Sequence, residues 1–301
     1  MRFPNQMLFN SLQNSYTNSN VHMNKLLKQI EANKRILVPS DDPAASAQLL
    51  MLRRGMADSE RYQSNIESLS GQLSQQEIQV SGSNKQLLSI LDSLREANNS
   101  DLSAADMSGY AQSIRANVSA LVGMVNARDD NGHYFFSGTM SDKAPLVRGA
   151  NGKWLFQGNH NNTAISVGNS NSVESRVDLV SALGGNVSVL NNLEDLLNKM
   201  DDPTLESSSY LSDISSMIGQ VNDAFDGSAS LLSELGTRQN MLTQMNETHE
   251  DSLVINQTMA DQLEGLNLPA AQMEFQKYTM VTEISMKNFV KILNLSPFGQ
   301  G

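Results

Sequence analysis

Apolar residues recur every three or four positions near both ends of this chain. Six of the eight positions that step by four and three from Leu12 to Leu37 are apolar, and the same step runs from Phe275 to Leu293. This spacing is typical of helices that pack lengthwise against other helices. We therefore predict two terminal arms that pair with each other or with another molecule. Their predicted assembly seam consists of Leu12, Tyr16, Met23, Leu26, Ile30, Leu37, Phe275, Met286, Phe289 and Leu293.

A second apolar repeat predicts a long helix from Ala45 to Asn98, about 80 Å in length. Shorter patterns predict helices at 107–129 and 210–221 and a longer one at 231–266. The fold class is therefore mainly α: an elongated antiparallel helical bundle or coiled-coil rod built from both halves of the chain. The predicted rod core consists of Leu49, Leu52, Met56, Ile66, Leu73, Val80, Leu87, Leu91, Leu94, Leu242, Met245 and Leu263.

The middle of the chain has a different pattern, typical of short β-strands. Asn151-Gly152 predicts a two-residue type I′ hairpin turn, and alternating segments follow at 163–167 and 173–179. We predict a small β-rich inserted outer domain with Trp154 and Phe156 in a core of its own.

Prolines mark the expected boundaries between these parts, because proline interrupts helices. Pro39, Pro43 and Pro269 separate the ends from the middle, and Asp42 can cap the helix that Pro43 begins. The expected domains are an N-terminal assembly arm (1–40), the first part of the rod (41–130), the β-rich domain (131–190), the second part of the rod (191–268) and a C-terminal assembly arm (269–301).

The amino-acid composition limits which partners and which chemistry we expect. The 301 residues carry a net charge of −11 and no cysteine, which argues against a nucleic-acid or membrane partner and against thiol chemistry. The chain lacks a long apolar run and a Sec-type leader, so we expect a soluble protein. We interpret the sixteen methionines as fillers of helix seams, in preference to a promiscuous binding surface.

Candidate catalytic residues are scarce. The sequence has no nucleophile-elbow, Walker or dinucleotide-binding glycine pattern, and the four histidines lack the spacing of metal ligands. His249 is interpreted as a polar residue in a helix seam, and Asp129-Asp130-Asn131-Gly132 as a turn in preference to a calcium loop. We expect no enzyme activity, cofactor or metal.

Several motifs together resemble the hook–filament junction proteins (hook-associated protein 3) of the flagellin family. Met1-Arg2-Phe3-Pro4-Asn5-Gln6-Met7 is similar to their start, and Pro39-Ser40-Asp41-Asp42-Pro43 to the block before the first long helix. Tyr134-Phe135-Phe136-Ser137-Gly138 resembles the entry to their outer domain. The tail from Ser296 to Gly301 differs from the leucine-rich end of filament flagellins.

This resemblance implies a structural subunit of the bacterial flagellum that is exported unfolded by type III secretion. It would be secreted to the extracellular hook–filament junction, form a ring-like layer with copies of itself, and link hook-associated protein 1 to flagellin. A cytoplasmic export chaperone would bind its C-terminal helix before export. Two alternatives remain open: a filament flagellin, and an intracellular coiled-coil scaffold protein.

Overall fold

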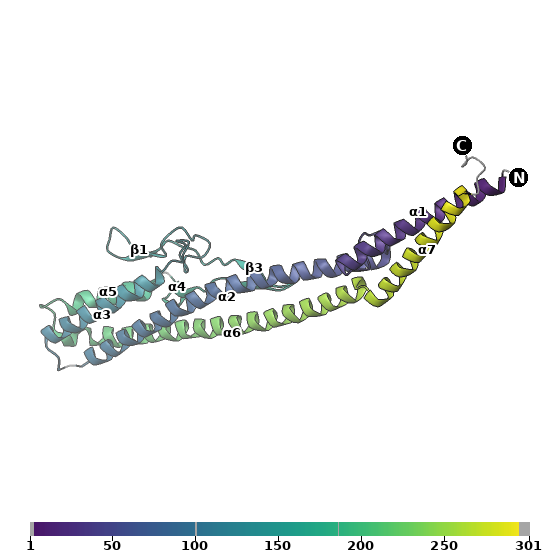
Figure 1. Ribbon diagram of the computed structural model, residues 1–301. Coiled ribbons are helices and arrows are strands. Elements are labelled where there is room, and N and C mark those ends of the chain that lie inside the picture. The colour runs from purple at the N-terminus through teal and green to yellow at the C-terminus, as the bar shows by residue number, and fades with distance from the viewer. Residues whose placement is uncertain (1–2, 100, 186, 295–301) are drawn as a thin grey trace. The chain divides into compact units, whose positions relative to one another are not determined.

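The computed structural model describes residues 3–99, 101–185 and 187–294 and is mainly helical, as the sequence predicts (Figure 1). The helices and strands, in order, are α1 (Phe3–Ala32), α2 (Pro43–Ala97), α3 (Ala104–Val125), β1 (Leu146–Arg148), β2 (Trp154–Phe156), β3 (Ala164–Ser166), β4 (Ser172–Glu174), α4 (Leu179–Ala182), α5 (Ser188–Met200), the 3-10 helix η1 (Ser207–Tyr210), α6 (Leu211–Glu264) and α7 (Leu268–Asn294).

The chain divides into two compact units. Unit 1 comprises Met1–Asp58 and Asp251–Gly301, and unit 2 comprises Ser59–Glu250. Unit 1 thus includes the first part of α2 and the last part of α6 in addition to the terminal helices. The five-part division at the prolines stays a prediction.

In unit 2, α2 and α6 run antiparallel, with α3 and α5 packed beside them (Figure 1). The Gln239 Nε2 amide of α6 donates to Glu77 Oε2 of α2 over 3.0 Å, and Arg115 of α3 pairs with Glu194 of α5 at 2.7 Å. Leucines that repeat at helical spacing, such as Leu73, Leu87 and Leu94, are buried between the helices. Burial of this apolar seam stabilises helices whose own propensity is ordinary.

The C-terminal half contains one long helix where the sequence pattern predicts two. α6 continues through 222–230 because the small residues Ala224 and Ser228 carry the buried seam across that interval. A Cβ atom added at Gly227 would lie 3.3 Å from the Cβ of Ala182, so the glycine lets the end of α4 approach closely. The prediction of separate helices at 210–221 and 231–266 was wrong.

The hairpin β1–β2 is confirmed, but its turn differs from the predicted one. Gly149 N donates to Lys153 O over 2.8 Å and Gly152 N donates to Gly149 O over 3.0 Å, which closes a three-residue loop. Gly152 has a positive φ of 77° and Asn151 does not, so a type I turn followed by a left-handed glycine replaces the type I′ turn. A second hairpin pairs β3 with β4.

The β-rich insertion has no separate core. Its buried residues belong to the same cluster as those of α2, α3 and α6, and Trp154 and Phe156 are half-buried at the edge of that cluster. The insertion shares this core through Phe136, Leu146, Val167, Val173, Val177, Leu179, Val180 and Leu183. The expected independent core around Trp154 and Phe156 was therefore wrong, because these short strands cover a helical surface that would otherwise be exposed.

Three side-chain amides, two on helices and one just after α3, dock the insertion through its backbone. Asn126, after α3, accepts from Leu146 N and donates to Leu146 O over 2.9 and 2.8 Å. Asn191 of α5 makes the same pair of bonds with Trp154 over 2.7 and 3.0 Å. Gln76 of α2 donates to Ser175 O and accepts from Val177 N. Each amide satisfies backbone groups that a strand edge would leave unpaired.

Candidate assembly surface of unit 1

The two terminal helices pack against each other. α1 and α7 lie side by side and antiparallel (Figure 1), with the Phe9 and Phe289 ring centroids 5.2 Å apart. The rings of His22 and Tyr278 stack at 5.1 Å, and Thr279 Oγ1 lies 3.7 Å from Met23 Sδ. The predicted pairing of the two ends with each other is thus present within one chain.

The predicted seam residues are unevenly covered in this pair. Leu26 is buried, whereas Tyr16 and Met286 are 39% and 58% exposed. The side chain of Leu293 lies outside the part that the structure describes. The half-buried members of the seam are Leu12, Met23, Ile30, Leu37, Phe275 and Phe289.

An apolar groove opens along this seam. Its volume is about 280 Å³, and Phe9, Leu12 and Tyr16 of α1 line it together with Met286 and Phe289 of α7. The groove is open because each helix of a two-helix pair buries only the face that it turns toward the other helix.

The loop between α1 and α2 is fixed by charged side chains. Asp41 accepts from Leu37 N at 2.9 Å and Val38 N at 3.2 Å and pairs with Lys25 Nζ at 2.7 Å. The Lys25 ammonium, followed by the two backbone donors, lowers the pKa of Asp41 to about 2. Asp42 caps α2, as predicted: it accepts from Ala45 N over 3.1 Å, and this bond together with Arg35 lowers its pKa.

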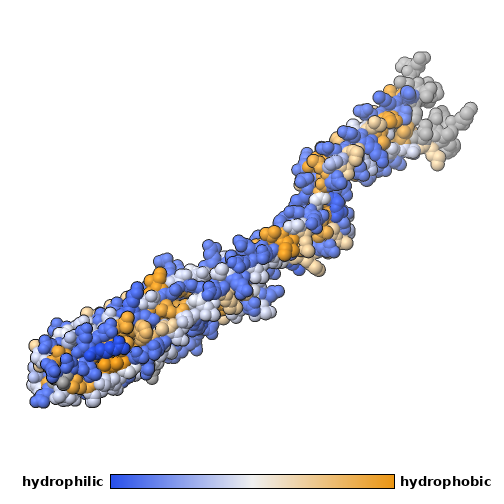
Figure 2. Space-filling model, turned by 90° about the horizontal axis from the view of Figure 1, so that it is seen from below, coloured by the Kyte–Doolittle hydropathy of each residue, from blue (hydrophilic) through white to orange (hydrophobic). Residues whose placement is uncertain are grey.

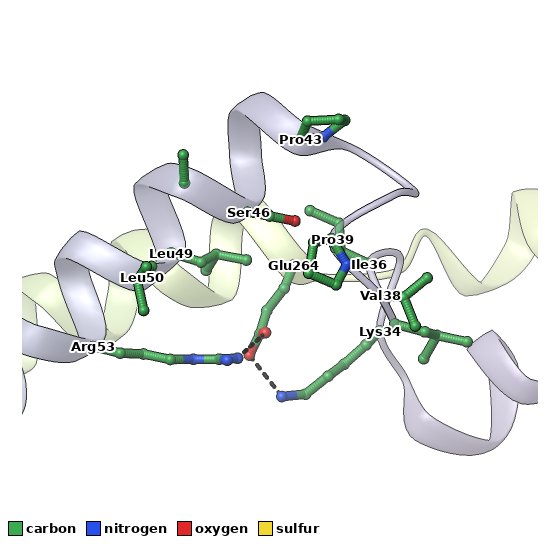
Figure 3. Close-up of a pocket in the computed structure, with 12 residues that line it drawn as sticks. Lys34, Ile36, Val38, Pro39, Pro43, Ser46, Leu49, Leu50, Arg53 and Glu264 are labelled. Carbon is green, nitrogen blue, oxygen red and sulfur yellow. Dashed lines mark hydrogen bonds and ion pairs between the residues drawn. The ribbon is translucent and has the colours of Figure 1, made fainter.

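A buried carboxylate joins this loop to the end of α6. Glu264 lies between Lys34 and Arg53, with N–O distances of 2.8 and 2.7 Å (Figure 3). Arg35 N also donates to Glu264 O over 2.7 Å. The ion pairs and this backbone bond connect three segments that are distant in sequence, so we regard Glu264 as the anchor of the loop.

Beside this anchor lies a second, wider groove. Its volume is about 660 Å³, and its walls include Ile36, Val38, Pro39, Leu49 and Leu50 (Figure 3). Ile36 and Leu49 are buried in a small cluster with Ala45 and Ala260, whereas Val38 and Leu50 are about half exposed. Apolar walls without a covering element are typical of a surface that meets a partner.

Exposed apolar side chains concentrate in unit 1. Among the described residues, sixteen of the twenty-two large apolar side chains that are well exposed belong to unit 1, although it is the smaller unit. On the face seen in Figure 2, groups of orange (hydrophobic) residues interrupt the blue (hydrophilic) surface. Such crowding is unusual for a surface that stays in water.

One face of α7 was missed by the sequence analysis. Met273, Met280 and Ile284 are separated by seven and four residues, so they share a face, and each is more than half exposed. This open face of α7 points away from Thr279, whose hydroxyl contacts Met23 of α1. The sequence contains this spacing of seven and four residues, but the prediction for this helix followed the seam repeat from Phe275 to Leu293 instead.

The methionines do not act mainly as seam fillers. Of the fifteen that the structure describes, only Met107, Met200 and Met217 are buried, and eight are well exposed. The interpretation of methionine as seam filler was therefore wrong for the majority of these residues. Flexible, polarisable thioethers on a surface are characteristic of binding faces.

Charge is also divided between the units. Unit 1 has ten basic and nine acidic residues, whereas unit 2 has eleven basic and twenty-three acidic residues. The segment from Phe3 to Asn24 contains no charged residue at all, yet most of its described side chains are exposed. Depletion of charge is a feature of interface centres, so these observations favour burial of unit 1 in an assembly.

The remaining predicted core residues lie in both units. Leu49 in unit 1 and Ile66, Leu73, Val80, Leu87, Leu91, Leu94 and Leu242 in unit 2 are buried. Leu52, Met56, Leu263 and Met245 are half-buried. His249 is half-buried in the seam, with Nε2 2.8 Å from Val167 O and its ring 5.3 Å from that of Tyr62. These contacts give His249 a packing role.

One cluster superficially resembles a catalytic triad. His160, Asp178 and Ser181 lie together, but Asp178 Oδ2 and Ser181 Oγ both approach the same nitrogen, His160 Nδ1, at 2.5 and 3.3 Å. Ser181 Oγ donates to Asp178 Oδ2 over 2.6 Å. A triad needs serine and aspartate on opposite ring nitrogens, so this arrangement does not activate the hydroxyl.

Within residues 3–99, 101–185 and 187–294, no group of three or more His, Cys, Asp or Glu side chains is placed to hold a metal ion. None of the helices in these ranges is both long and apolar enough to span a bilayer.

The chain is similar in sequence to proteins of the bacterial flagellum. Residues 3–141 match the family of the bacterial flagellin N-terminal helical region. This match covers slightly less than half of the chain and shows a similarity to the helical N-terminal region of flagellins. The chain is also 29% identical over 146 residues to flagellar hook-associated protein 3 of Escherichia coli, a match that covers 48% of this chain and 46% of the relative. The chain thus spans about half the length of the curated relatives that it matches.

Solved structures give a longer match. A putative flagellar hook-associated protein from Vibrio parahaemolyticus is 27% identical, with a TM-score of 0.68 over 75% of this chain and all of that one. Hook-associated protein 3 from Legionella pneumophila shares the fold, with 16% identity and a TM-score of 0.64 over 71% of this chain and 98% of its own. The resemblance to hook-associated protein 3 that the motifs predict is confirmed.

Proposed function

We propose that this chain is a structural subunit of the bacterial flagellum that assembles through unit 1 at the hook–filament junction. The observation that carries the proposal is the concentration of exposed apolar side chains on a unit with almost balanced charge. Burial of such a surface between subunits releases water from apolar area and isolates few unpaired charges.

The partners follow from that position. Copies of this chain would form a ring-like layer, with hook-associated protein 1 on one side and flagellin on the other. Before export through the type III channel, a cytoplasmic chaperone would cover the C-terminal helix. The open face of α7, with Met273, Met280 and Ile284, is an apolar surface of the kind that a chaperone covers.

A filament flagellin is the nearer alternative, since the matched family is named for flagellin. The two functions are separated by complementation. In a strain that lacks its junction protein, the chain should restore flagellin filaments on existing hooks and be detected by antibody only at the filament base. Long filaments composed of this chain in a strain without flagellin would identify it as a flagellin instead.

The location of the assembly surface can be tested with a matched pair of variants. Ile284→Asp changes the open face of α7, where Ile284 is 51% exposed, and Ile78→Asp changes an isoleucine of unit 2 that is 67% exposed. Both should leave the free energy of unfolding within about 0.5 kcal/mol of wild type, because both side chains are already in water. Only Ile284→Asp should abolish motility in complementation. Loss of motility from both variants, or from Ile78→Asp alone, would contradict assembly through unit 1.

The intracellular scaffold is the second alternative, and export tests it. The chain should appear in the culture supernatant of a hook-deficient strain and remain in the cells when the type III export apparatus is removed. Retention in cells with an intact apparatus would favour the scaffold.

A further inference from the structure

The exposed thioethers of α7 are the strongest unexplained chemical feature of the molecule. Met273, Met280 and Met286 are 67%, 63% and 58% exposed. Met273 and Met280 lie on the open face of α7, and Met286 lines the groove between α1 and α7. The sequence contains no cysteine, so the thioethers are the sulfur groups that an oxidant can reach on this helix.

The reaction of such a thioether is well defined. Hydrogen peroxide transfers one oxygen atom to the methionine sulfur, which loses two electrons, and water leaves. The product, methionine sulfoxide, is a polar and chiral side chain in place of a flexible apolar one. Methionine sulfoxide reductases, supplied with a thiol reductant that provides two electrons, release the oxygen as water and restore the thioether.

Because these three side chains are exposed in the free chain, their oxidation should affect the free subunit and the assembled subunit differently. In the free chain each side chain already contacts water, so a sulfoxide there requires little desolvation and should leave the fold intact. Burial of the same sulfoxide against an apolar neighbour removes water from a polar oxygen without a guaranteed donor, and that burial is unfavourable. Oxidation should therefore weaken the contacts between subunits and leave the fold of the free subunit intact.

We infer that Met273, Met280 and Met286 form an oxidation-sensitive site, whose conversion to sulfoxide by peroxide-class oxidants prevents incorporation of the subunit. This inference rests on the proposed function, since it needs unit 1 to be buried in the assembled flagellum. Oxidation and reduction of these methionines would thus control subunit incorporation reversibly in a chain without cysteine.

The test uses the purified full-length chain, which is added with flagellin to hook-bearing cells that lack their own junction protein. Three forms are compared: wild type, the variant Met273→Leu/Met280→Leu/Met286→Leu, and the variant Met140→Leu/Met241→Leu. The second pair lies in unit 2, with 39% and 42% exposure, and serves as a matched control. Each form is used untreated and after hydrogen peroxide, with the oxidised sites mapped by mass spectrometry.

We expect oxidised wild type to keep its helical circular dichroism and to lose filament recovery by about tenfold or more. The α7 leucine variant should retain its recovery after oxidation to within about twofold of its untreated form, whereas the unit 2 variant should lose recovery like wild type. Treatment of oxidised wild type with methionine sulfoxide reductases and dithiothreitol as the reductant should restore recovery. Buried Met107, Met200 and Met217 should stay unoxidised in the folded chain.

Two results would overturn the inference while leaving the proposed function intact. One is full recovery with oxidised wild type whose three α7 methionines are sulfoxides. The other is equal loss of recovery by the oxidised α7 leucine variant, which would place the sensitive groups elsewhere. If untreated wild type fails to restore filaments, the proposed function itself fails.

Discussion

At the scale of single residues, the spacing of apolar side chains predicts which of them are buried in the chain. Apolar residues at 3.5-residue spacing from 66 to 94 predict burial correctly, because long helices that pack in one chain repeat the same contact at each turn. Met273 and Met280 of unit 1 are also one heptad apart, but both are exposed. Spacing shows that a face is apolar and does not show whether its partner belongs to the same molecule.

The leucine seam of α2 allows a direct test of its register. Leu87 and Leu91 are each 1% exposed, whereas Ser89 between them is exposed. Leu87→Asp and Leu91→Asp should each lower the free energy of unfolding by roughly 3 kcal/mol or more, since each places an unpaired carboxylate in an apolar core. Ser89→Asp should change it by less than about 0.5 kcal/mol. Thermal and urea unfolding of the three variants measures these effects, and equal losses would show that the register is wrong.

Asp41 makes the loop between α1 and α2 sensitive to acid. Its pKa of about 2 is below the ordinary value of 3.8, so the folded chain releases this proton more readily than the unfolded chain does. The stabilisation by ionised Asp41 is therefore complete above about pH 4 and is lost as the pH falls toward 2. We expect Asp41→Asn to lower the melting temperature at pH 6, and the difference from wild type to shrink between pH 4 and pH 2.

The control for this titration is Glu31→Gln, which removes an exposed carboxylate on α1. Its melting temperature should follow that of wild type at every pH in the series. A difference between Asp41→Asn and wild type that stays constant from pH 6 to pH 2 would exclude ionised Asp41 as the source of the stabilisation.

At the scale of elements, side-chain amides dock the hairpin β1–β2 on the helices. Asn191 bonds both backbone groups of Trp154, which is the only tryptophan of the chain. Asn191→Ala should lower the free energy of unfolding by about 1–2 kcal/mol, because it leaves an N–H and a C=O without their partners. The fluorescence of Trp154 should shift to longer wavelength while helical circular dichroism is preserved.

Asn192→Ala is the matched control on the same helix. Asn192 donates to Gln220 over 2.8 Å, is exposed, and bonds no hairpin backbone group that the structure describes. Its fluorescence spectrum should equal that of wild type. The same red shift in both variants would point to a general loosening of α5 in place of a lost docking bond.

Element boundaries were predictable where local chemistry determines them. Pro43 and Asp42 begin α2, and the second hairpin forms where the alternating segments predict strands. No helix was predicted at α5, although Val189, Leu193 and Leu197 repeat at helical spacing and most of the helix lies in the expected second part of the rod (191–268). The pattern predicted two helices in place of α6 because the buried residues between them, Ala224 and Ser228, are small and do not continue a repeat of large apolar residues. Both errors concern contacts between segments distant in sequence.

At the scale of the whole molecule, the two units differ in charge and in exposed apolar surface. Acidic residues exceed basic ones by twelve in unit 2, while the two kinds nearly balance in unit 1. Like charges oppose close packing of copies through unit 2, and apolar surface favours packing through unit 1. A single chain therefore contains one unit suited to contact with other subunits and one suited to contact with water.

The same contrast predicts where the free subunit opens first. The pair α1–α7 buries few of its described side chains, namely Ser19, Leu26, Gln29, Ala271 and Ser285. Unit 2, in contrast, contains a large continuous core. Local opening is easiest where few apolar groups are buried, so both terminal helices should be removed early by limited proteolysis. We expect a resistant fragment of about residues 40–268, identified by mass spectrometry.

That fragment should keep a cooperative thermal transition and yet fail to restore motility to a strain that lacks its junction protein. The physical reason is that unit 2 retains its own core, whereas the groove of Phe9, Leu12 and Met286 is lost together with the open face of α7. Digestion of assembled flagella provides the control, because subunit contacts that bury α1 and α7 should protect both helices there. Motility with the trimmed chain, or terminal helices of the monomer that resist protease as long as α2 and α6 do, would contradict assembly through the terminal helices.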